Sequence, residues 1–381
     1  MTTNSKEIKL KLVSPTFDSK LLDSIMELNY LRRSQLHGST SPYLFFQLKK
    51  IFHLLESVGS ARIEGNRTTI SEYIETKIEQ KENSTDTFME IANVERAMEY
   101  IEQSIKTGTP ISNHFIRELH QLTVSDLKNE GDKTPGAYRS WQVQIAQSGH
   151  MPPEPHMMQS YMDELVDFIN DNNEEKFDLI KVAIVHHRFV WIHPFGNGNG
   201  RVVRLLTYAL LIKYGFRVQD GQLLNPTAVF CNDRDMYYKM LSIADIGTDD
   251  SMLQWCEYVL TGVCDEISKI NKLLDHDYLV SNILKPAINK GRKRELITAI
   301  EEKVLKKGVT KQTFKSSDIS SLKLNLSTRQ ITLLIAKLKS NKLISTTKEK
   351  GREYFVSFQN NYLMRGLIQQ LESEKFIPPI D

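Results

Sequence analysis

The residues best suited to chemistry lie in one stretch, His193-Pro-Phe-Gly-Asn-Gly-Asn-Gly-Arg201-Val-Val-Arg204. Every residue from Gly196 to Gly200 is Gly or Asn, the types that best tolerate positive φ, so backbone N–H groups can turn inward and form an anion-binding nest. Arg201 and Arg204 share one helix face, where both can bind phosphate oxygens. His193 is the nearby group that titrates near neutral pH. The pattern predicts transfer chemistry on a nucleotide.

Two helices are expected to position this stretch. Residues 177–190 are apolar at helical spacing before it, and residues 202–214 follow it and end at Gly215. The loop therefore opens onto a helix N-terminus, where N–H groups and the helix dipole favour an anion. A solvent turn is the alternative explanation of the glycines, but it does not account for a histidine and two arginines at fixed spacing.

The stretch also resembles a family motif. HPFGNGNGRVVR is similar to HPFx(D/E)GN(G/K)RxxR of Fic proteins, which transfer AMP from ATP to protein hydroxyls. The resemblance implies that His193 takes the proton from a target Tyr, Ser or Thr hydroxyl, which attacks the α-phosphorus of ATP and releases pyrophosphate. It implies that the N–H groups of Gly198, Asn199 and Gly200, with the Asn199 side chain, hold the α-phosphate. Arg201 and Arg204 would hold the β- and γ-phosphates.

The motif has one departure, because Asn197 stands where the family has Asp or Glu. The family's acidic residue binds Mg²⁺ between the α- and β-phosphates, and a neutral amide is a poorer ligand for this hard cation. Two interpretations stay open for Asn197 as metal ligand and ATP contact: the phosphates hold most of the metal, or activity is low.

A second segment, Ser60-Ala-Arg-Ile-Glu64-Gly65-Asn66, ends a helix expected over residues 42–64. A glutamate in the last turn opposes the helix dipole at a cost of about 0.3–1 kcal/mol, so a compensating cation is expected. The segment is similar to the inhibitory motif (S/T)xxxE(G/N) of Fic proteins. The resemblance implies that Glu64 lies at the ATP site, pairs with Arg204 and blocks the γ-phosphate. It makes Ser60 a further residue of the inhibitory motif. A solvated surface glutamate is the alternative.

Residues 137–146 alternate enough for a strand, and a turn at 147–150 precedes Pro152-Pro153. The segment resembles the Fic flap, a hairpin that registers the target by strand pairing and covers the nucleotide. The resemblance therefore implies ATP contacts for Gln144, Ile145 and Ala146. A surface hairpin without function is the alternative.

Further along, Asn232-Asp-Arg-Asp-Met-Tyr237-Tyr238-Lys-Met-Leu241 resembles the Fic segment NR..YY..L. The resemblance implies that Tyr237 lines the nucleoside pocket and that Asp245 contacts ribose or adenine, although aromatic residues at helical spacing are commonly core. His186 and His187 lack metal-ligand spacing, and adjacent helical residues point about 100° apart, so packing is favoured over metal binding.

The last hundred residues are basic. Residues 281–381 hold 20 Lys and Arg against 9 Asp and Glu, a net +11, which leaves −9 on the rest. A helix near 291–307, a helix capped by Ser327 and two β-prone stretches (343–347 and 353–357) resemble a winged helix-turn-helix. DNA contact through residues 316–357 is expected, with protein contact as the alternative.

Composition fits a globular protein of two or three domains, with 381 residues, 40% of them hydrophobic and 25% charged. No apolar run reaches membrane-spanning length, and the start has no signal-peptide core. The three cysteines lack metal-ligand spacing and indicate reduced thiols. We therefore expect a cytoplasmic protein without membrane contact.

The expected fold is mostly α. It comprises an N-terminal helical region with the inhibitory helix (1–110), a Fic-type catalytic core with a β-hairpin flap (111–275) and a winged-helix domain (276–381). The expected function is a protein adenylyltransferase that uses ATP and, subject to Asn197, Mg²⁺. Its partners are a target protein with a hydroxyl side chain and, by automodification, the chain itself; a homodimer stays open. Three alternatives remain: an ATP-binding pseudoenzyme, a relative that removes AMP or transfers another phosphate-containing group, and a DNA-binding regulator.

Overall fold

The structure, a computed structural model, describes residues 8–33, 39–79, 85–145, 149–171, 174–218, 224–359 and 362–377. The chain packs as two units, one within residues 1–35, 53–68 and 84–267, the other within 36–52, 69–83 and 268–381. The domain boundaries predicted at 110/111 and 275/276 do not coincide with the edges of these units. The helix α2 (Pro42–Ile63) begins in the second unit and ends in the first.

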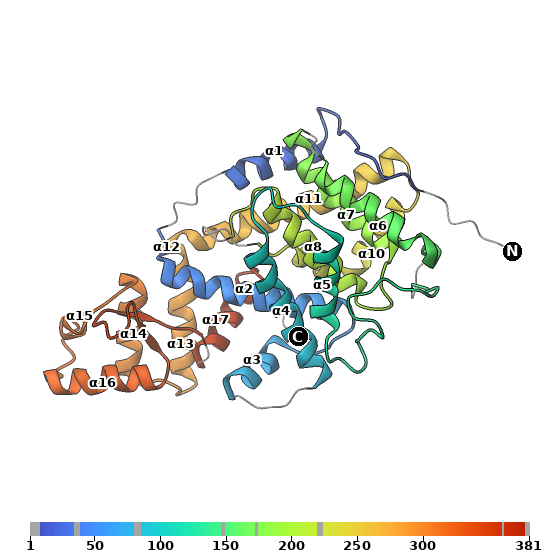
Figure 1. Cartoon of the computed structure of the whole chain (residues 1–381). Helices are drawn as coiled ribbons and strands as arrows, with labels where there is room; N and C mark the ends of the chain where they lie inside the picture. The colour runs from blue at the N-terminus through green and yellow to red at the C-terminus, as the bar shows by residue number, and fades with distance from the viewer. Residues whose placement is uncertain are drawn as a thin grey trace. The chain divides into compact units, whose positions relative to one another are not determined.

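The first unit is helical in its described residues, which confirms the prediction of a mostly α fold (Figure 1). Besides the end of α2 it contains α1 (Lys20–Arg33), α4 (Asp86–Ser104), α5 (Asn113–Val124), η1 (Pro155–Met157), α6 (Met158–Asn170), η2 (Glu175–Phe177), α7 (Asp178–Ile192), α8 (Asn199–Lys213), α9 (Thr227–Cys231), α10 (Arg234–Ala244) and most of α11 (Asp249–Asn271). Among the described helices, none is long and apolar enough to cross a membrane.

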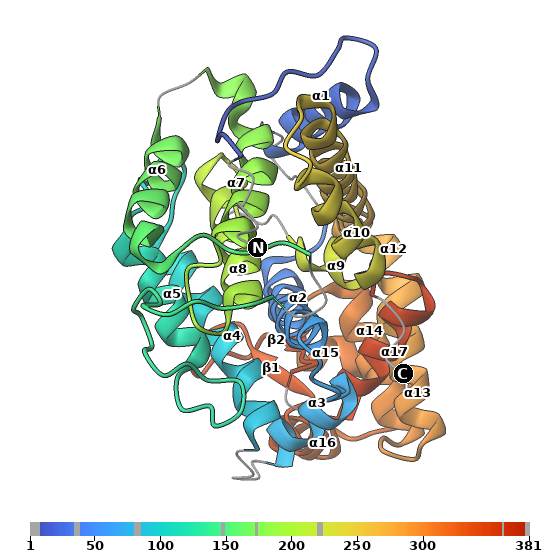
Figure 2. The same cartoon turned by 90° about the vertical axis from the view of Figure 1, so that its right-hand side faces the viewer.

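The helices α7 and α8 form the centre of this unit and lie side by side in both views (Figure 1 and Figure 2). Every side chain of α8 from Arg201 to Lys213 is buried. A helix enclosed on all sides must be largely apolar, and charged side chains are almost never fully buried without partners. Arg201 and Arg204 at its start therefore require anions beside them.

The second unit contains one short hairpin among helices. Its elements are the start of α2, α3 (Ile70–Glu79), η3 (Lys272–Leu274), α12 (His276–Tyr278), the π-helix η4 (Leu279–Leu284), α13 (Lys285–Lys293), α14 (Ala299–Lys311), α15 (Ser316–Ser320), α16 (Thr328–Ser340), β1 (Ile344–Thr346), β2 (Tyr354–Val356) and α17 (Tyr362–Ser373). The strands are antiparallel, with Ile344 opposite Val356. Gln47 of α2 binds the chain at the end of β2, since its Nε2 donates to the Val356 carbonyl at 3.1 Å.

The sequence predicted this unit in part. The strands lie within the stretches 343–347 and 353–357, and the Ser327 cap is confirmed, because its Oγ accepts from the Gln330 N–H. For the helix expected over residues 291–307, the predicted start is too early. It begins at Ala299, since Thr298 and Glu301 form a reciprocal capping box there.

The predicted flap strand is wrong for the described residues of segment 137–153, whose backbone is irregular from 137 to 145 and from 149 to 153. Hydrogen bonds from side chains hold this segment, where backbone pairing between strands was expected. The buried Arg139 donates to the carbonyls of His193 (2.8 Å), Trp141 (3.0 Å) and Pro153 (2.6 Å). Gln142 donates to the Pro152 carbonyl at 2.9 Å. One cation thus satisfies carbonyls that strand pairing would otherwise have to satisfy.

We predict that Arg139→Met lowers stability by about 2–4 kcal/mol, because three carbonyls lose a charged donor. Thermal unfolding followed by circular dichroism measures this loss. As a control, Gln142→Met removes one neutral bond and should cost about 1 kcal/mol or less. Equal melting temperatures for Arg139→Met and Gln142→Met would show that Arg139 does not hold the segment.

Candidate active site

His193 ends α7 in the left-handed region, with φ 51° and ψ 61°. This conformation costs on the order of 1 kcal/mol for a residue with a Cβ, and the bond from Arg139 to its carbonyl helps to hold it. His193 Nδ1 lies 3.4 Å from the Val190 carbonyl, so Nδ1 carries the proton and Nε2 is left to accept one. Burial lowers the pKa of His193 to about 4, so the ring is neutral at pH 7.

Two asparagine side chains hold the loop after His193. Asn199 accepts from the Phe195 N–H and donates to the Phe195 carbonyl, both at 2.9 Å. Asn197 accepts from the Gly198 N–H at 2.7 Å and donates to the Gly131 carbonyl at 3.2 Å. The Asn199 amide was expected to face the α-phosphate, but here it closes the loop on itself.

A histidine and an aspartate brace the same loop from outside. Asp132 accepts from the Asn197 N–H at 2.8 Å. His120 Nδ1 accepts from the Gly136 N–H at 2.9 Å, so its Nε2 carries the proton and donates to the Asn197 carbonyl at 3.1 Å. Burial raises the pKa of Asp132, but bonds from His120 and from backbone N–H groups outweigh it and hold that pKa well below its usual range. The backbone at position 197 is thus fixed on both sides.

The start of α8 is built to receive an anion. Its N-cap is Gly198, with φ 75°, and no side chain caps the helix, so the first-turn N–H groups are left for a ligand. A Cβ at Gly200 would overlap Oε1 of Glu64 and would lie 3.1 Å from Nη1 of Arg204. Glycine at position 200 therefore lets a carboxylate approach the helix backbone.

Glu64 and Arg204 form the contact that the sequence predicted. Arg204 Nη2 donates to Glu64 Oε1 at 2.7 Å, and Arg204 also donates from Nε to Ser60 Oγ and from Nη2 to the Ser60 carbonyl, both at 2.9 Å. Burial raises the pKa of Glu64, but the charge and hydrogen bond of Arg204 outweigh it, so the pKa lies below its usual value. The ion pair is therefore formed at neutral pH and is lost only as the pH falls through that lowered pKa.

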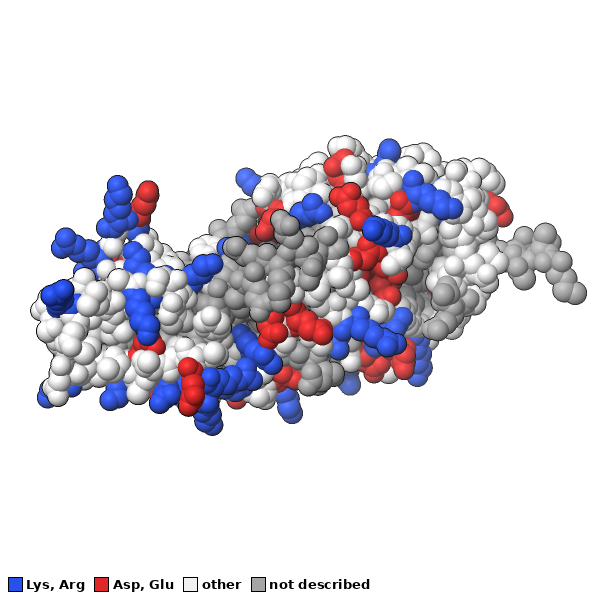
Figure 3. Space-filling model, turned by 90° about the horizontal axis from the view of Figure 1, so that it is seen from below, with Lys and Arg blue, Asp and Glu red and all other residues white. Residues whose placement is uncertain are grey.

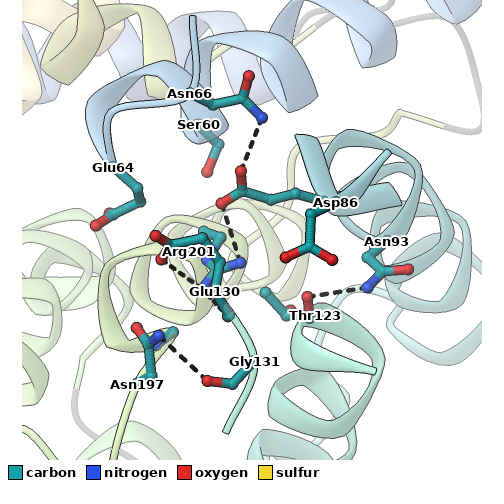
Figure 4. A network of polar contacts seen from close by, with 12 residues as sticks. Ser60, Glu64, Asn66, Asp86, Asn93, Thr123, Glu130, Gly131, Asn197 and Arg201 are labelled. Atoms are coloured by element: carbon teal, nitrogen blue, oxygen red, sulfur yellow. Dashed lines mark hydrogen bonds and ion pairs between the residues drawn. The ribbon is translucent and has the colours of Figure 1, made fainter. Parts of the chain in front are cut away.

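Arg201 has a partner that the sequence did not reveal. Its Nη1 lies 3.0 Å from Oε1 of Glu90 in α4. Its Nη2 donates to the Glu130 carbonyl at 2.8 Å (Figure 4). Both side chains of the ion pair are at most 2% exposed. Nε of Arg201 makes no hydrogen bond within the described part of the chain. A buried donor left in this way costs about 1–3 kcal/mol, which a phosphate oxygen could recover.

Tyr237 and Asp245 lie against the two histidines of α7. Thr207 donates to the Val203 carbonyl, so it accepts from His186 Nδ1, and His186 Nε2 accepts from the Tyr237 hydroxyl at 2.9 Å. His187 Nε2 lies 2.9 Å from Oδ1 of Asp245. Tyr237 is 2% exposed, as a core residue would be. The nucleoside contacts of Tyr237 and Asp245 stay predictions, and the histidines pack as expected.

The flap residues expected at the nucleotide are only partly described. Gln144 is exposed and Ile145 is half-buried, both in irregular backbone. Ala146 lies outside the described residues. Their ATP contacts stay predictions.

The donor set does not fit a metal ion held by the chain itself. The Asn197 amide oxygen is already bonded to Gly198, and both Asp132 oxygens accept from loop groups. Over the described ranges, no three His, Cys, Asp or Glu side chains lie where they could hold a metal. Asn197 as an Mg²⁺ ligand is therefore not supported by its contacts.

Sequence reasoning missed Glu90, His120, Asp132 and Arg139. One signal was present for Glu90: Asp86, Glu90 and Asn93 recur at helical spacing on one face of α4, where apolar residues would be usual. For the others the partners are distant in sequence, and no local pattern indicates them.

Comparison with known proteins agrees with this site. Residues 110–211 match the model of the Fic/DOC family. The chain is 30% identical over 241 residues to protein adenylyltransferase Fic of Drosophila willistoni, covering 62% of this chain and 45% of the relative. It is 29% identical over 249 residues to the protein of that name from Nematostella vectensis, covering 64% and 52%. The chain thus spans about half the length of these relatives.

Solved structures support the fold alone. A Fic family protein from Desulfovibrio desulfuricans G20 has a TM-score of 0.56 at 18% identity, covering 91% of this chain and 98% of that chain. Fic-1 from C. elegans, residues 134–508, has a TM-score of 0.53 at 21% identity, covering 65% and 71%. The segment 110–211, which holds His193, the glycine-rich loop and both arginines, therefore matches a Fic/DOC family domain in sequence, within a chain that resembles solved Fic proteins in fold.

Proposed function

We propose that this chain is a protein adenylyltransferase, which transfers AMP from ATP to a Tyr, Ser or Thr hydroxyl of a target protein. One observation carries the proposal: the Glu64 carboxylate lies on Gly200 at the start of α8 and is bound by Arg204. An anion already occupies the place that a nucleotide phosphate would take. The two relatives named protein adenylyltransferase Fic support the same activity.

In the proposed mechanism, Nε2 of neutral His193 accepts the proton of the target hydroxyl. The hydroxyl oxygen forms a bond to the α-phosphorus of ATP as the bond to pyrophosphate breaks. First-turn N–H groups of α8 stabilise the charge on the α-phosphate. The hydrogen bond of the Asn199 side chain to the Phe195 N–H holds the loop in the conformation that directs these groups toward the phosphate. Nε of Arg201 and the fork of Arg204 receive the β- and γ-phosphates.

We further propose that Glu64 inhibits the enzyme. Its carboxylate uses the Arg204 donor that a γ-phosphate would need, and it lies over Gly200. A carboxylate bound in this way lowers ATP affinity or misplaces the triphosphate until the end of α2 moves away. An ATP-binding pseudoenzyme would share this geometry without transfer, and an enzyme that removes AMP would need the same residues.

The second unit favours a further role. The order α14, α15, α16 and a basic hairpin is that of a winged helix-turn-helix, which we propose for residues 299–356. Ile331, Ile335 and Leu338 of α16 are buried, which leaves a mostly polar face exposed, with Arg329 in the first turn and Leu333 one turn later. Figure 3 shows Lys and Arg side chains gathered over the left end of this view. We propose duplex DNA as the partner of this face.

We predict that Glu64→Gly raises labelling from α-³²P-ATP, on the chain itself and on added protein targets, because Arg204 becomes available to the γ-phosphate. Arg204→Ala should lose labelling, since it removes the inhibitory contact and the phosphate ligand together. Equal labelling by wild type and Glu64→Gly would contradict inhibition. A gain in Arg204→Ala would show that its role is the reverse of the one proposed.

We predict that AMP transfer by Glu64→Gly keeps its rate down to about pH 5 and falls as the pH approaches 4. The sign follows from the direction of the shift: the lowered pKa keeps His193 neutral and basic until the pH falls to about 4. His193→Ala in the same background should lose about 10²–10⁴-fold in rate with little change in ATP affinity. A rate that already halves near pH 6.5 would mean that the base is exposed or is another group.

We predict that Asn197→Asp melts at a lower temperature than wild type without Mg²⁺ and recovers when Mg²⁺ and ATP are added. The new carboxylate oxygen would face the Gly131 carbonyl where the amide now donates at 3.2 Å, and a cation relieves that repulsion. Thermal melts with and without Mg²⁺ measure it. Identical Mg²⁺ responses of the two proteins would contradict this account of position 197.

We predict that the full chain binds duplex DNA with an affinity that falls steeply with salt, because its basic residues must displace phosphate counterions. Arg329→Glu should weaken binding in a fluorescence anisotropy titration, whereas Lys9→Glu, outside the second unit, should not. Binding that ignores salt, or no binding at low salt, would favour a protein partner for this unit.

A further inference from the structure

Glu90 is a buried carboxylate whose two oxygens serve two different parts of the site. Its Oε1 lies 3.0 Å from Nη1 of Arg201, and its Oε2 accepts from Nδ2 of Asn66 at 2.8 Å. The side chain is 2% exposed. A carboxylate enclosed in this way is stable only with such partners, so its position is set by Arg201 and Asn66 together.

The helix that carries Glu90 also holds the backbone on which Arg201 rests. Asp86, one turn earlier in α4, accepts from the N–H groups of Lys128 and Asn129 at 2.6–3.1 Å. The next residue, Glu130, provides the carbonyl that accepts from Arg201 Nη2 at 2.8 Å. One face of α4 therefore positions both ends of the Arg201 fork. Glu90 contacts Nη1 directly, and Asp86 holds the loop whose Glu130 carbonyl binds Nη2.

Asn66 brings the end of the inhibitory segment to the same point. It lies two residues after Glu64, beyond Gly65 with φ 103°. Its Nδ2 also donates to the Thr87 carbonyl at 2.9 Å, and its Oδ1 accepts from the Thr68 N–H at 2.9 Å. The segment that places Glu64 on Arg204 is thus anchored beside the carboxylate that holds Arg201.

We propose that Glu90 is a positioning residue that orients Arg201 for the second phosphate of a bound nucleotide and, through Asn66, joins Arg201 to the segment that carries Glu64. Glu90 holds the Nη1 edge of the guanidinium by an ion pair. Nε and Nη1 make no hydrogen bond within the described chain, so both are left to meet a phosphate oxygen. A donor held in place in advance loses less freedom on binding. This inference rests on the proposed nucleotide site, but not on the transfer of AMP.

The test is calorimetric titration of ADP and AMP into Glu64→Gly, with and without Glu90→Gln. If Glu90 orients Arg201, Glu90→Gln should weaken ADP binding about 10-fold, the equivalent of one charge-assisted hydrogen bond. AMP, which lacks the second phosphate, should bind within about 2-fold of the parent. Glu102→Gln is the matched control: it changes another carboxylate of α4, one bonded to Tyr208, and should alter neither affinity.

Equal weakening of ADP and AMP, unchanged ADP affinity, or no ADP binding by Glu64→Gly would each overturn this inference. If Glu90→Gln does not fold, as judged by its melting curve, Asn66→Ala replaces it and should show a smaller loss confined to ADP. Binding of ADP without any AMP transfer would contradict the proposed function, while the difference between ADP and AMP still decides the role of Glu90.

Discussion

Two buried arginines at the positive end of a helix are the constraint on which the rest of the structure depends. Arg201 and Arg204 lie in the first two turns of α8, where the helix dipole and the unpaired N–H groups already favour negative charge. Charges enclosed in this way are stable only beside anions. The chain supplies Glu90 for one arginine and Glu64 for the other. In the proposed function, the phosphates of a bound nucleotide meet the same requirement.

The two carboxylates differ in how they are held. Glu90 belongs to α4, whose buried face packs into the core of the first unit, so it stays with Arg201. Glu64 follows the last turn of α2, and its side chain is 29% exposed. In the proposed inhibition, Glu64 is therefore the carboxylate that leaves with a small local movement, and Arg204 is the arginine that changes partner. Under this proposal, the anion beside Arg201 keeps the geometry of the site, and the exchangeable anion beside Arg204 regulates it.

The sequence predicted the parts of this site that depend on local pattern. The glycine-rich loop between two apolar helices and the Glu64–Arg204 contact are both present. The prediction of a flap strand is wrong for the described residues. Alternation of apolar and polar residues cannot show that the Arg139 guanidinium binds the carbonyls that strand pairing would otherwise use. Glu90 was missed because one buried carboxylate in an apolar helix face looks like a surface residue until its partner, over a hundred residues away, is known. Local periodicity indicates where helices lie, but the pairing of buried charges is decided by packing.

The central claim is that Glu64 and the terminal phosphate of ATP compete for Arg204. The most direct measurement is the ratio of ATP affinity to ADP affinity, by calorimetry, for wild type and for Glu64→Gly. In wild type the γ-phosphate has no free partner, so the ratio should lie near unity, and in Glu64→Gly it should rise by about 10-fold, as one charge-assisted contact is gained. The same ratio in both proteins would contradict the account, because it would show that Arg204 binds the γ-phosphate whether or not Glu64 is present.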